Sequence, residues 1–390
     1  MLEFGEEQDF KYIVNIKVIG VGGGGNNAVR HMINSDMKGI DFWVANTDSQ
    51  SLANFSKENR IYLGQNLTKG LGAGANPEIG RKAAIESEDA IKTALRGADM
   101  VFIAAGMGGG TGTGAAPVIA RVCKEMGCLT IGIVTRPFTF EGKVRNQNAV
   151  EGLQALRPHV DSLIVVSNDQ LMQMSGNVPV KDAFRQADNI LAHSVKTITD
   201  LIVKPARINL DFADVRNIMA NKGTALIGMG KGNGINKVKE AALSAISSPL
   251  LESSIRGAKN AIVSIRGGDT ITILDTNEIV EIVREAAGGS DINVIFGLDT
   301  DDTIGDTVEV TVIATDFEGS DIHKINGQLN EKYGIDPKDS FRKIDLSDYM
   351  SPKTKNEPSI QSLEKNFDEI EETNIDNDDL LPAFLRKRNK

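Results

Sequence analysis

Several features that mark other protein classes are scarce in this chain of 390 residues. It has only 2 cysteines, Cys123 and Cys128, and we interpret both as small buried hydrophobic residues in a reducing compartment, not as a disulfide. Its 4 histidines lie far apart, without metal-ligand spacing. Basic residues do not outnumber acidic ones, and the net charge of -10 argues against a nucleic-acid-binding protein, which would present a basic face.

Long apolar runs are also missing. No stretch of about 18 uncharged apolar residues is present, so the sequence predicts no membrane span. The N-terminus, MLEFGEEQDF, is acidic and has no apolar segment, so we expect no signal peptide. These features together predict a cytoplasmic protein.

The length of the chain is sufficient for two hydrophobic cores and a tail. Between residues 12 and 168, strand-like and helix-like runs alternate, which predicts a doubly wound parallel α/β sheet with helices on both faces. The expected strands are 13–19, 42–46, 100–104, 129–134 and 163–166, and the expected helices are 27–34, 77–95, 116–126 and 144–156.

A long helix is expected over 181–203, because apolar residues recur there at helical spacing. Pro205 would end it. A second, smaller α/β region follows with a mixed sheet: its expected strands are 225–229, 261–265, 293–296 and 308–313, and its expected helices are 237–246 and 277–287.

Beyond Asp316 the apolar residues lose any sustained period. Residues 364–379 carry eight acids and one lysine, which is typical of a solvated, disordered tether. The last residues turn apolar and then basic.

The most informative segment is a glycine-rich loop between an expected strand and an expected helix. Free backbone N–H groups at the start of a helix form an anion site. The loop has no lysine, so it is not the phosphate loop in which a lysine reaches the β- and γ-phosphates. Its residues are Gly108, Gly109, Gly110, Thr111, Gly112, Thr113 and Gly114.

Two further glycine clusters, at 20–27 and 70–77, also precede expected helices. The first formally fits GxGxxG, and Asp48 could hold a ribose, so a nicotinamide-dependent enzyme is the alternative at this point. Three such loops at strand ends suit a triphosphate better than one pyrophosphate. The residues of interest are Gly22, Gly23, Gly24, Gly25, Asn26, Asn27, Gly72, Ala73, Gly74 and Ala75.

The segments GGGTGTG, GVGGGGNNA and NLDFADV resemble the FtsZ family of tubulin-like cell-division GTPases. The resemblance covers residues 17–315 nearly continuously and returns in the tail. It implies the tubulin/FtsZ fold and binding of GTP and GDP by the three glycine loops, together with Asn46 and Pro137. It also implies Mg²⁺ held mainly by the phosphates and not by the protein, with K⁺ or Na⁺ as a further candidate ion.

The same resemblance implies that Glu141 binds the ribose and that Arg145 contacts the nucleotide. An amide and a carboxylate, Asn168 and Asp188, can recognise guanine, because the carboxylate accepts from N1–H and the exocyclic amine. Phe184, one turn before Asp188, could stack on the base. Residues 171–179 lack the acidic pattern common in relatives.

Asp211 and Asp214 lie three apart at an expected helix start, and with Asn209 they are the candidate catalytic residues. If Asp188 contacts the base, the fifteen helical residues to Val203 span about 20–25 Å, at about 1.5 Å per residue. The two acids would then act on the nucleotide of another subunit. Such a head-to-tail contact propagates into a filament.

The expected domains are a GTP-binding domain at 12–180, a core helix at 181–204, an activation domain at 205–316, a linker at 317–375 and a docking peptide at 376–390. The resemblance implies self-association, a role in the midcell division ring, and membrane tethers and regulators as partners, with the membrane reached only indirectly. The alternative is a tubulin-like filament for plasmid segregation or cell shape. The docking residues would be Asp379, Leu381, Pro382, Phe384, Leu385 and Arg386.

Overall fold

The structure is a computed structural model that describes residues 14–35, 37–175, 178–204, 206–289 and 291–317. All of them lie in Met1–Ile335, the first of the two units into which the chain divides. The predicted docking peptide, Pro205 and all but the first residue of the predicted linker fall outside the described residues. Within the described part of the chain, no helix combines the length and apolar character needed to cross a membrane.

Six parallel strands form the first part of the sheet, in the order β3-β2-β1-β4-β5-β6. The chain moves outward from β1 in one direction and then returns to place β4 on its other side. This reversal is the switch point at which doubly wound sheets bind ligands, beyond the carboxyl ends of their strands. The strands are β1 (Ile16–Val21), β2 (Ile40–Asn46), β3 (Arg60–Tyr62), β4 (Met100–Gly106), β5 (Leu129–Arg136) and β6 (Ser162–Ser167).

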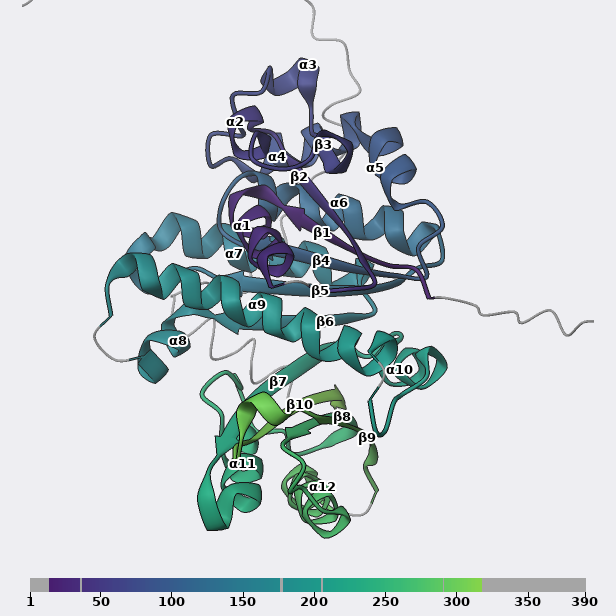
Figure 1. The fold of residues 1–390 in the computed structure, drawn as a ribbon. Coiled ribbons are helices and arrows are strands. Elements are labelled where there is room, and N and C mark those ends of the chain that lie inside the picture. Colours follow the sequence, from purple (N-terminus) through teal and green to yellow (C-terminus); the bar gives the residue numbers. More distant parts are fainter. Residues whose placement is uncertain (1–13, 36, 176–177, 205, 290, 318–390) are drawn as a thin grey trace, which may run out of the picture. The chain divides into compact units, whose positions relative to one another are not determined.

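Helices cover both faces of this sheet, as Figure 1 shows. One face packs against α1 and the long helix through a single apolar cluster, and the other packs against α4 to α7 through a second cluster. The predicted doubly wound fold is therefore confirmed. The helices are α1 (Gly22–Asn34), α2 (Ser49–Leu52), α3 (Gln65–Thr68), α4 (Pro77–Glu86), α5 (Glu88–Leu95), α6 (Thr111–Glu125), α7 (Lys143–Leu156) and α8 (Asn168–Ser175).

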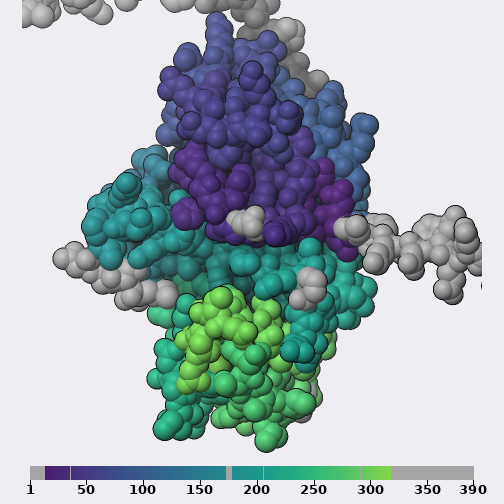
Figure 2. Space-filling view, in the orientation of Figure 1, coloured from purple at the N-terminus to yellow at the C-terminus, as the bar shows by residue number. Residues whose placement is uncertain are grey.

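The long helix α9 (Val180–Val203) runs unbroken and leads to the second α/β region. There β7 pairs with β6 over three residues, so the two sheets join in the order β6-β7-β10-β8-β9. In Figure 2 the teal surface of α9 lies between the purple surface of the first strands and helices and the green surface of this region. Its elements are α10 (Phe212–Met219), β7 (Gly223–Gly232), α11 (Lys237–Ile246), β8 (Ala258–Gly267), α12 (Ile273–Ala287), β9 (Asn293–Thr300) and β10 (Val308–Phe317).

The second sheet is mixed, as expected: β10 runs antiparallel to β7 and β8, and β8 runs parallel to β9. One face of this sheet has an apolar core of its own. On the other face, Ile227, Ile262 and Ile313 belong to the cluster that also contains α1 and α9, so this cluster is shared by the two regions. The domain boundary expected at residue 205 stays a prediction, because the β6–β7 pairing joins the two regions.

Three local expectations need correction. The single helix expected over 77–95 is two helices, because Ser87 leaves the helical conformation with φ -102° and ψ 18° and its hydroxyl accepts from Gly64 N at 2.9 Å. The strand β3 and the helix α8 were not expected. The helix expected from residue 277 begins at Ile273, where Thr272 and Asp275 form a capping box.

The two cysteines are free and buried, as predicted, and burial raises the pKa of both thiols. Cys123 lies in α6, but Cys128 precedes β5 and is not part of that strand. Its Sγ donates to Ala98 O at 3.2 Å.

Candidate nucleotide-binding and catalytic site

The three glycine clusters come together at the carboxyl edge of the first sheet. A Cβ on Gly22 would lie 2.7 Å from Gly112 N, so the first loop touches the start of α6. A Cβ on Gly110 would lie 2.8 Å from Ala73 Cβ, so the third cluster touches the same loop. The predicted convergence of the three clusters on one site is therefore what the geometry shows.

Glycines in these loops fall into two groups. At Gly112 and Gly114 a Cβ would strike backbone oxygen, 2.6 Å from Gly106 O and 1.9 Å from Pro77 O. These glycines let the loops pack against one another. At Gly23, Gly74 and Gly109 a Cβ would meet no protein atom within 4 Å, so the bare backbone there faces space that protein atoms do not fill.

The glycine runs are helix starts, not irregular loops. The helix α1 begins at Gly22 and α6 at Thr111, earlier than expected in both cases. Asn76 caps α4 by accepting from Glu78 N at 2.9 Å, and Pro77 is the first helical residue, which is where this helix was expected to begin. Helix N-termini expose unpaired N–H groups and partial positive charge, so this edge suits the anionic phosphates of a nucleotide.

Two buried asparagines hold the first loop. With its amide oriented to satisfy both ends, Asn26 donates to Gly20 O at 2.8 Å and to Gly22 O at 3.1 Å, and accepts from Asn46 Nδ2 at 3.1 Å. Asn27 is exposed on α1. Asn26 and Asn46 therefore shape the backbone of the loop.

Polar groups also fix the loop at 108–114, and the loop at 70–77 contains a residue with an uncommon backbone conformation. Thr113 Oγ1 accepts from Gly108 N at 2.8 Å. Thr47, a residue that sequence reasoning missed, shares a hydrogen bond of 2.6 Å with the hydroxyl of Thr111. Ala75 has φ 59°, a left-handed conformation that is uncommon for residues other than glycine and that marks functional sites.

Pro137 follows the end of β5 and lies beside the glycine loop at 108–114. A Cβ on Gly108, where φ is +97°, would lie 3.2 Å from Pro137 Cγ. Glu141 accepts from Phe138 N at 2.9 Å and pairs with Arg145 Nε at 3.0 Å. The structure brings these residues to the edge of the sheet, while their contacts with ribose and nucleotide remain predictions.

Asn168 and Asp188 lie at the far side of this edge. Asn168 begins α8 directly after β6, and its buried Oδ1 has no hydrogen-bond partner among the described residues. Burial raises the pKa of Asp188 to about 7, against the opposing charge of Arg30. A buried amide oxygen without a partner among the described residues and a partly buried carboxyl with a raised pKa fit the polar edge of a base.

Phe184 belongs to an aromatic group at this end of α9. Its ring contacts Phe138 edge to face, with centroids 5.1 Å apart, and Phe138 stacks on Phe140 at 4.9 Å. Phe138 is fully buried, whereas Phe184 is 39% exposed. The accessible part of the Phe184 side chain is consistent with the predicted stacking on a base.

Asp48, the ribose candidate of the nicotinamide alternative, is engaged elsewhere. Its side chain caps α2 by accepting from Gln50 N at 2.9 Å and from Ser51 Oγ at 2.7 Å. These hydrogen bonds lower the pKa of Asp48.

The candidate catalytic residues lie at the other end of α9. Leu210 N donates to Leu201 O at 3.1 Å, which fixes this segment to the last turns of the helix. Asp211 caps α10 by accepting from Asp214 N at 2.8 Å, and both acids are exposed. Asn209 accepts from Ala206 N at 3.0 Å. Figure 1 shows α8 and α10 at opposite ends of α9.

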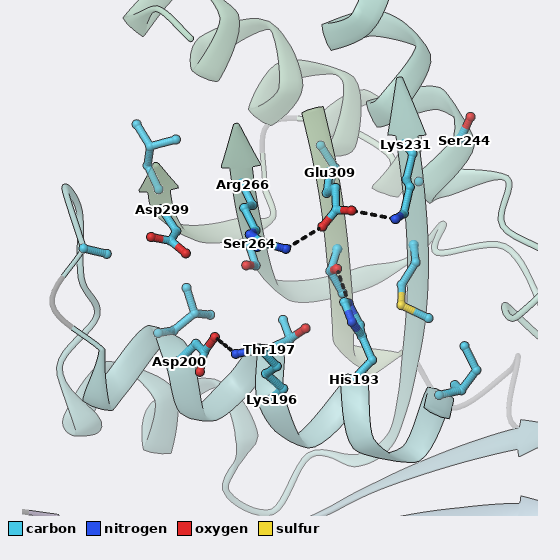
Figure 3. Close-up of a pocket in the computed structure, with 18 of the residues that line it drawn as sticks. His193, Lys196, Thr197, Asp200, Lys231, Ser244, Ser264, Arg266, Asp299 and Glu309 are labelled. Atoms are coloured by element: carbon cyan, nitrogen blue, oxygen red, sulfur yellow. Dashed lines mark hydrogen bonds and ion pairs between the residues drawn. The ribbon is translucent and has the colours of Figure 1, made fainter. Parts of the chain in front are cut away.

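A separate cavity lies away from this edge. It has a volume of about 760 Å³ between α9 and the second sheet, and its acidic and basic side chains are largely paired with one another. Figure 3 shows three of these pairs, Lys196–Asp200, Lys231–Glu309 and Arg266–Glu309. It also shows the hydrogen bond of His193, whose ring nitrogen lies 3.3 Å from the hydroxyl of Thr311. A smaller pocket of about 340 Å³ borders the nucleotide edge at Asn46, Thr47 and Gly70. No group of three or more metal-ligating His, Cys, Asp or Glu occurs among the residues that the structure describes.

A doubly wound sheet with three helix N-termini at its switch point, joined by a long helix to a mixed sheet, defines the class of tubulin-like GTPases. Residues 15–176 match the tubulin/FtsZ family GTPase domain, and residues 223–318 match the FtsZ family C-terminal domain.

Solved structures agree with these matches. The chain is 42% identical to FtsZ from M. jannaschii, described as an empty dimer, with a TM-score of 0.75 over 78% of this chain and 89% of that chain. CetZ1 and CetZ2 from Haloferax volcanii are 21% and 19% identical, with TM-scores of 0.70 and 0.68 over 82% of this chain and 99% and 98% of theirs. The two CetZ structures show the shared fold alone. This chain belongs to the FtsZ family of GTPases, which excludes the nicotinamide alternative.

Proposed function

We propose that this chain polymerises head to tail and forms the cytokinetic ring of dividing cells. GTP held by one subunit is hydrolysed with Asp211 and Asp214 of the next subunit. The observation that carries this proposal is the position of the two acids at the far end of an unbroken α9. Fifteen helical residues separate Asp188 from Val203, which is about 22 Å at about 1.5 Å per residue.

Within one subunit, the chain's own groups bind the nucleotide. The N-termini of α1, α4 and α6 donate backbone N–H groups to the phosphates. Asp188 accepts from N1–H and the exocyclic amine of guanine, a pair of donors that adenine lacks on that edge. The buried Asn168 Oδ1, which has no hydrogen-bond partner in the part of the chain that the structure describes, supports the same selectivity.

Hydrolysis needs an oriented water and stabilisation of the charge on the phosphates. Asp211 and Asp214 are exposed, and their carboxylates accept hydrogen bonds from a water on the neighbouring subunit's nucleotide. When bound, Mg²⁺ would be held mainly by the phosphates and would neutralise charge that develops during the transfer. The backbone N–H groups of the glycine loops hold the transferred group in place.

Assembly follows from the same geometry, because the nucleotide edge and the start of α10 are different surfaces. A contact between two different surfaces is heterologous, and it produces an open filament unless the rotation closes a ring. The FtsZ relative from M. jannaschii is described as a dimer, which supports self-association. Hydrolysis then depends on assembly.

The cellular part of the proposal rests on the FtsZ relatives and on the tail sequence. The docking peptide at 376–390, which lies outside the described residues, would recruit a membrane tether or regulators. A fluorescently labelled chain should therefore gather at midcell in the cytoplasm before division. Filaments that avoid midcell in dividing cells would favour the alternative, a filament for plasmid segregation or cell shape.

A mixing experiment tests catalysis across the interface. Asp211→Asn removes the charge but keeps a good helix cap, so α10 should fold as before. Asp188→Ala removes the guanine contact but keeps Asp211 and Asp214. Each variant alone should lose at least about 100-fold in GTPase rate, as expected when a water-activating group is removed. A mixture should recover part of the activity at mixed interfaces, whereas normal hydrolysis by Asp211→Asn alone would disprove the proposal.

A further inference from the structure

A buried ion pair joins the nucleotide edge to the second α/β region. Arg136 is the last residue of β5, and Glu252 lies in the loop after α11. Arg136 Nη2 lies 3.1 Å from Glu252 Oε1, and the two side chains are only 14% and 13% exposed. Among the ion pairs formed between described residues, this pair connects the part of the chain before α8 with the part after β7.

The pair is incompletely satisfied. Arg136 Nε and Glu252 Oε1 are buried, and neither has a hydrogen-bond partner among the described residues, although the charged groups are within ion-pair distance. Burial raises the pKa of Glu252, while the Arg136 charge opposes that shift. A buried ion pair with imperfect geometry contributes little net stability to the folded chain. Stability is therefore not a sufficient reason for two charged side chains at this buried position.

The incomplete bonding is concentrated in one corner of the molecule. Within the described part of the chain, four buried side-chain atoms lack a partner, and the other two are Asn168 Oδ1 and Gln170 Oε1. Arg136 pairs in register with Ser167 on β6, directly before Asn168. Through this strand pairing, Arg136 is close to the amide that is expected to contact guanine, although it is distant in the chain.

Arg136 is also directly joined to the wall of the site. Pro137 packs toward Gly108, and Phe138 contacts Phe184. Because Phe138 is fully buried, a shift of Arg136 cannot be absorbed there without moving its neighbours.

The opposite ends of β5 and β6 are tied differently. Asp161 Oδ2 accepts from Thr130 N at 2.8 Å, and its backbone oxygen accepts from Lys222 N and Gly223 N at 2.8 and 2.9 Å. The strand pairing of β6 with β7 is at this end. The two regions share an apolar cluster, and at its edges they are joined by satisfied backbone bonds at one end of β5 and β6 and by a partly satisfied ion pair at the other.

We propose that Arg136 and Glu252 form a latch through which the second region positions the Pro137–Phe138 wall, so that Glu252 controls how long a guanine nucleotide stays bound. In this role Arg136 and Glu252 are positioning residues, acting on the nucleotide through Pro137 and Phe138. The inference rests on the proposed guanine nucleotide site.

The test measures release of a fluorescent GDP analogue from the full chain, at concentrations too low for assembly. Glu252→Gln and Arg136→Met should each speed release by about three- to tenfold, within the range for coupled neighbours. The double variant should release the analogue no faster than either single variant, and exchanging the two charges should restore part of the slow release. Lys204→Met is the matched control, because it breaks the ion pair of Lys204 with Asp299, 2.5 Å apart at the other end of α9, and should leave the rate unchanged.

A merely structural role would lower thermal stability without changing the release rate. Release from Glu252→Gln at the wild-type rate would overturn the latch, as would single effects that multiply in the double variant. If Arg136→Met does not fold, Glu252→Gln decides the question alone. Failure of the unmodified chain to retain the GDP analogue would contradict the proposed function itself.

Discussion

At the scale of single residues, the base end of the site depends on a carboxyl group in an unfavourable environment. Asp188 is largely shielded from water, and burial raises its pKa from the ordinary 3.8 to about 7. Near neutral pH the nucleotide-free chain therefore holds this group partly protonated. Guanine offers two donors to the ionised form, so binding should draw the carboxyl back toward ionisation.

Nucleotide affinity should therefore depend on pH. Below about pH 7 binding must displace a proton from Asp188, so the Kd for GDP should rise as pH falls, by at most about tenfold per pH unit. Equilibrium dialysis from pH 6 to 8 measures this effect, and Asp188→Asn should bind more weakly and with a flat profile. A flat profile in the unmodified chain would contradict the role given to Asp188.

The same shift has a consequence for stability, with a definite sign. The pKa of Asp188 is higher in the folded chain than in the unfolded chain. Its contribution to the free energy of unfolding is therefore fully present below about pH 4, and it is lost as pH rises through about 7. Bound guanine nucleotide should remove this loss by supplying donors to the carboxylate.

At the scale of elements, the glycine loops work as helix starts whose side-chain-free backbones serve two purposes. Some glycines allow close packing between loops, and others leave space for a ligand. The sequence alone could not separate these groups, because both occur in one run of glycines and differ only in what faces the missing Cβ.

Two alanine substitutions should distinguish glycines needed for close packing from glycines that leave space for a ligand. Gly114→Ala should destabilise the fold by about 1–3 kcal/mol, as overpacking does, because its Cβ would lie 1.9 Å from Pro77 O. Gly109→Ala should change stability by no more than about 0.5 kcal/mol, as for sites without packing constraints. It should nevertheless weaken GDP binding, because its methyl group enters the space left for the phosphates.

Urea unfolding and equilibrium dialysis on both variants give the comparison. Unchanged GDP binding by a normally stable Gly109→Ala would show that this loop does not hold the phosphates.

Much of the element pattern could be predicted from the sequence. The long amphipathic α9 and the start of a helix at residue 77 are confirmed. Both have strong local signals, the second because asparagine is a preferred helix cap and proline a preferred first helical residue. The break at Ser87 could not be predicted, since it depends on hydrogen bonds to Gly64 and Tyr62, more than twenty residues away. The short β3 was missed because three residues, Arg60–Tyr62, are too few for a periodic pattern. The Thr272–Asp275 capping box was a usable signal that was overlooked.

At the scale of the whole molecule, the nucleotide edge and the two candidate catalytic acids lie at opposite ends of α9, and one subunit cannot bring them together. The nucleotide edge lies at the carboxyl ends of β1, β4, β5 and β6, and the acids lie where α9 meets α10. The sequence could predict this separation because a continuous helix has a fixed rise per residue. It could not predict the Arg136–Glu252 contact, which joins residues distant in the chain through tertiary packing.

The most direct measurement is the GTPase rate per subunit as a function of total protein concentration. If the acids of one subunit serve the nucleotide of another, activity should be near background in dilute monomer and should rise steeply above a critical concentration. Light scattering on the same samples should detect filaments at that same concentration. A rate per subunit that stays constant and high down to concentrations at which only monomer is present would contradict the central claim.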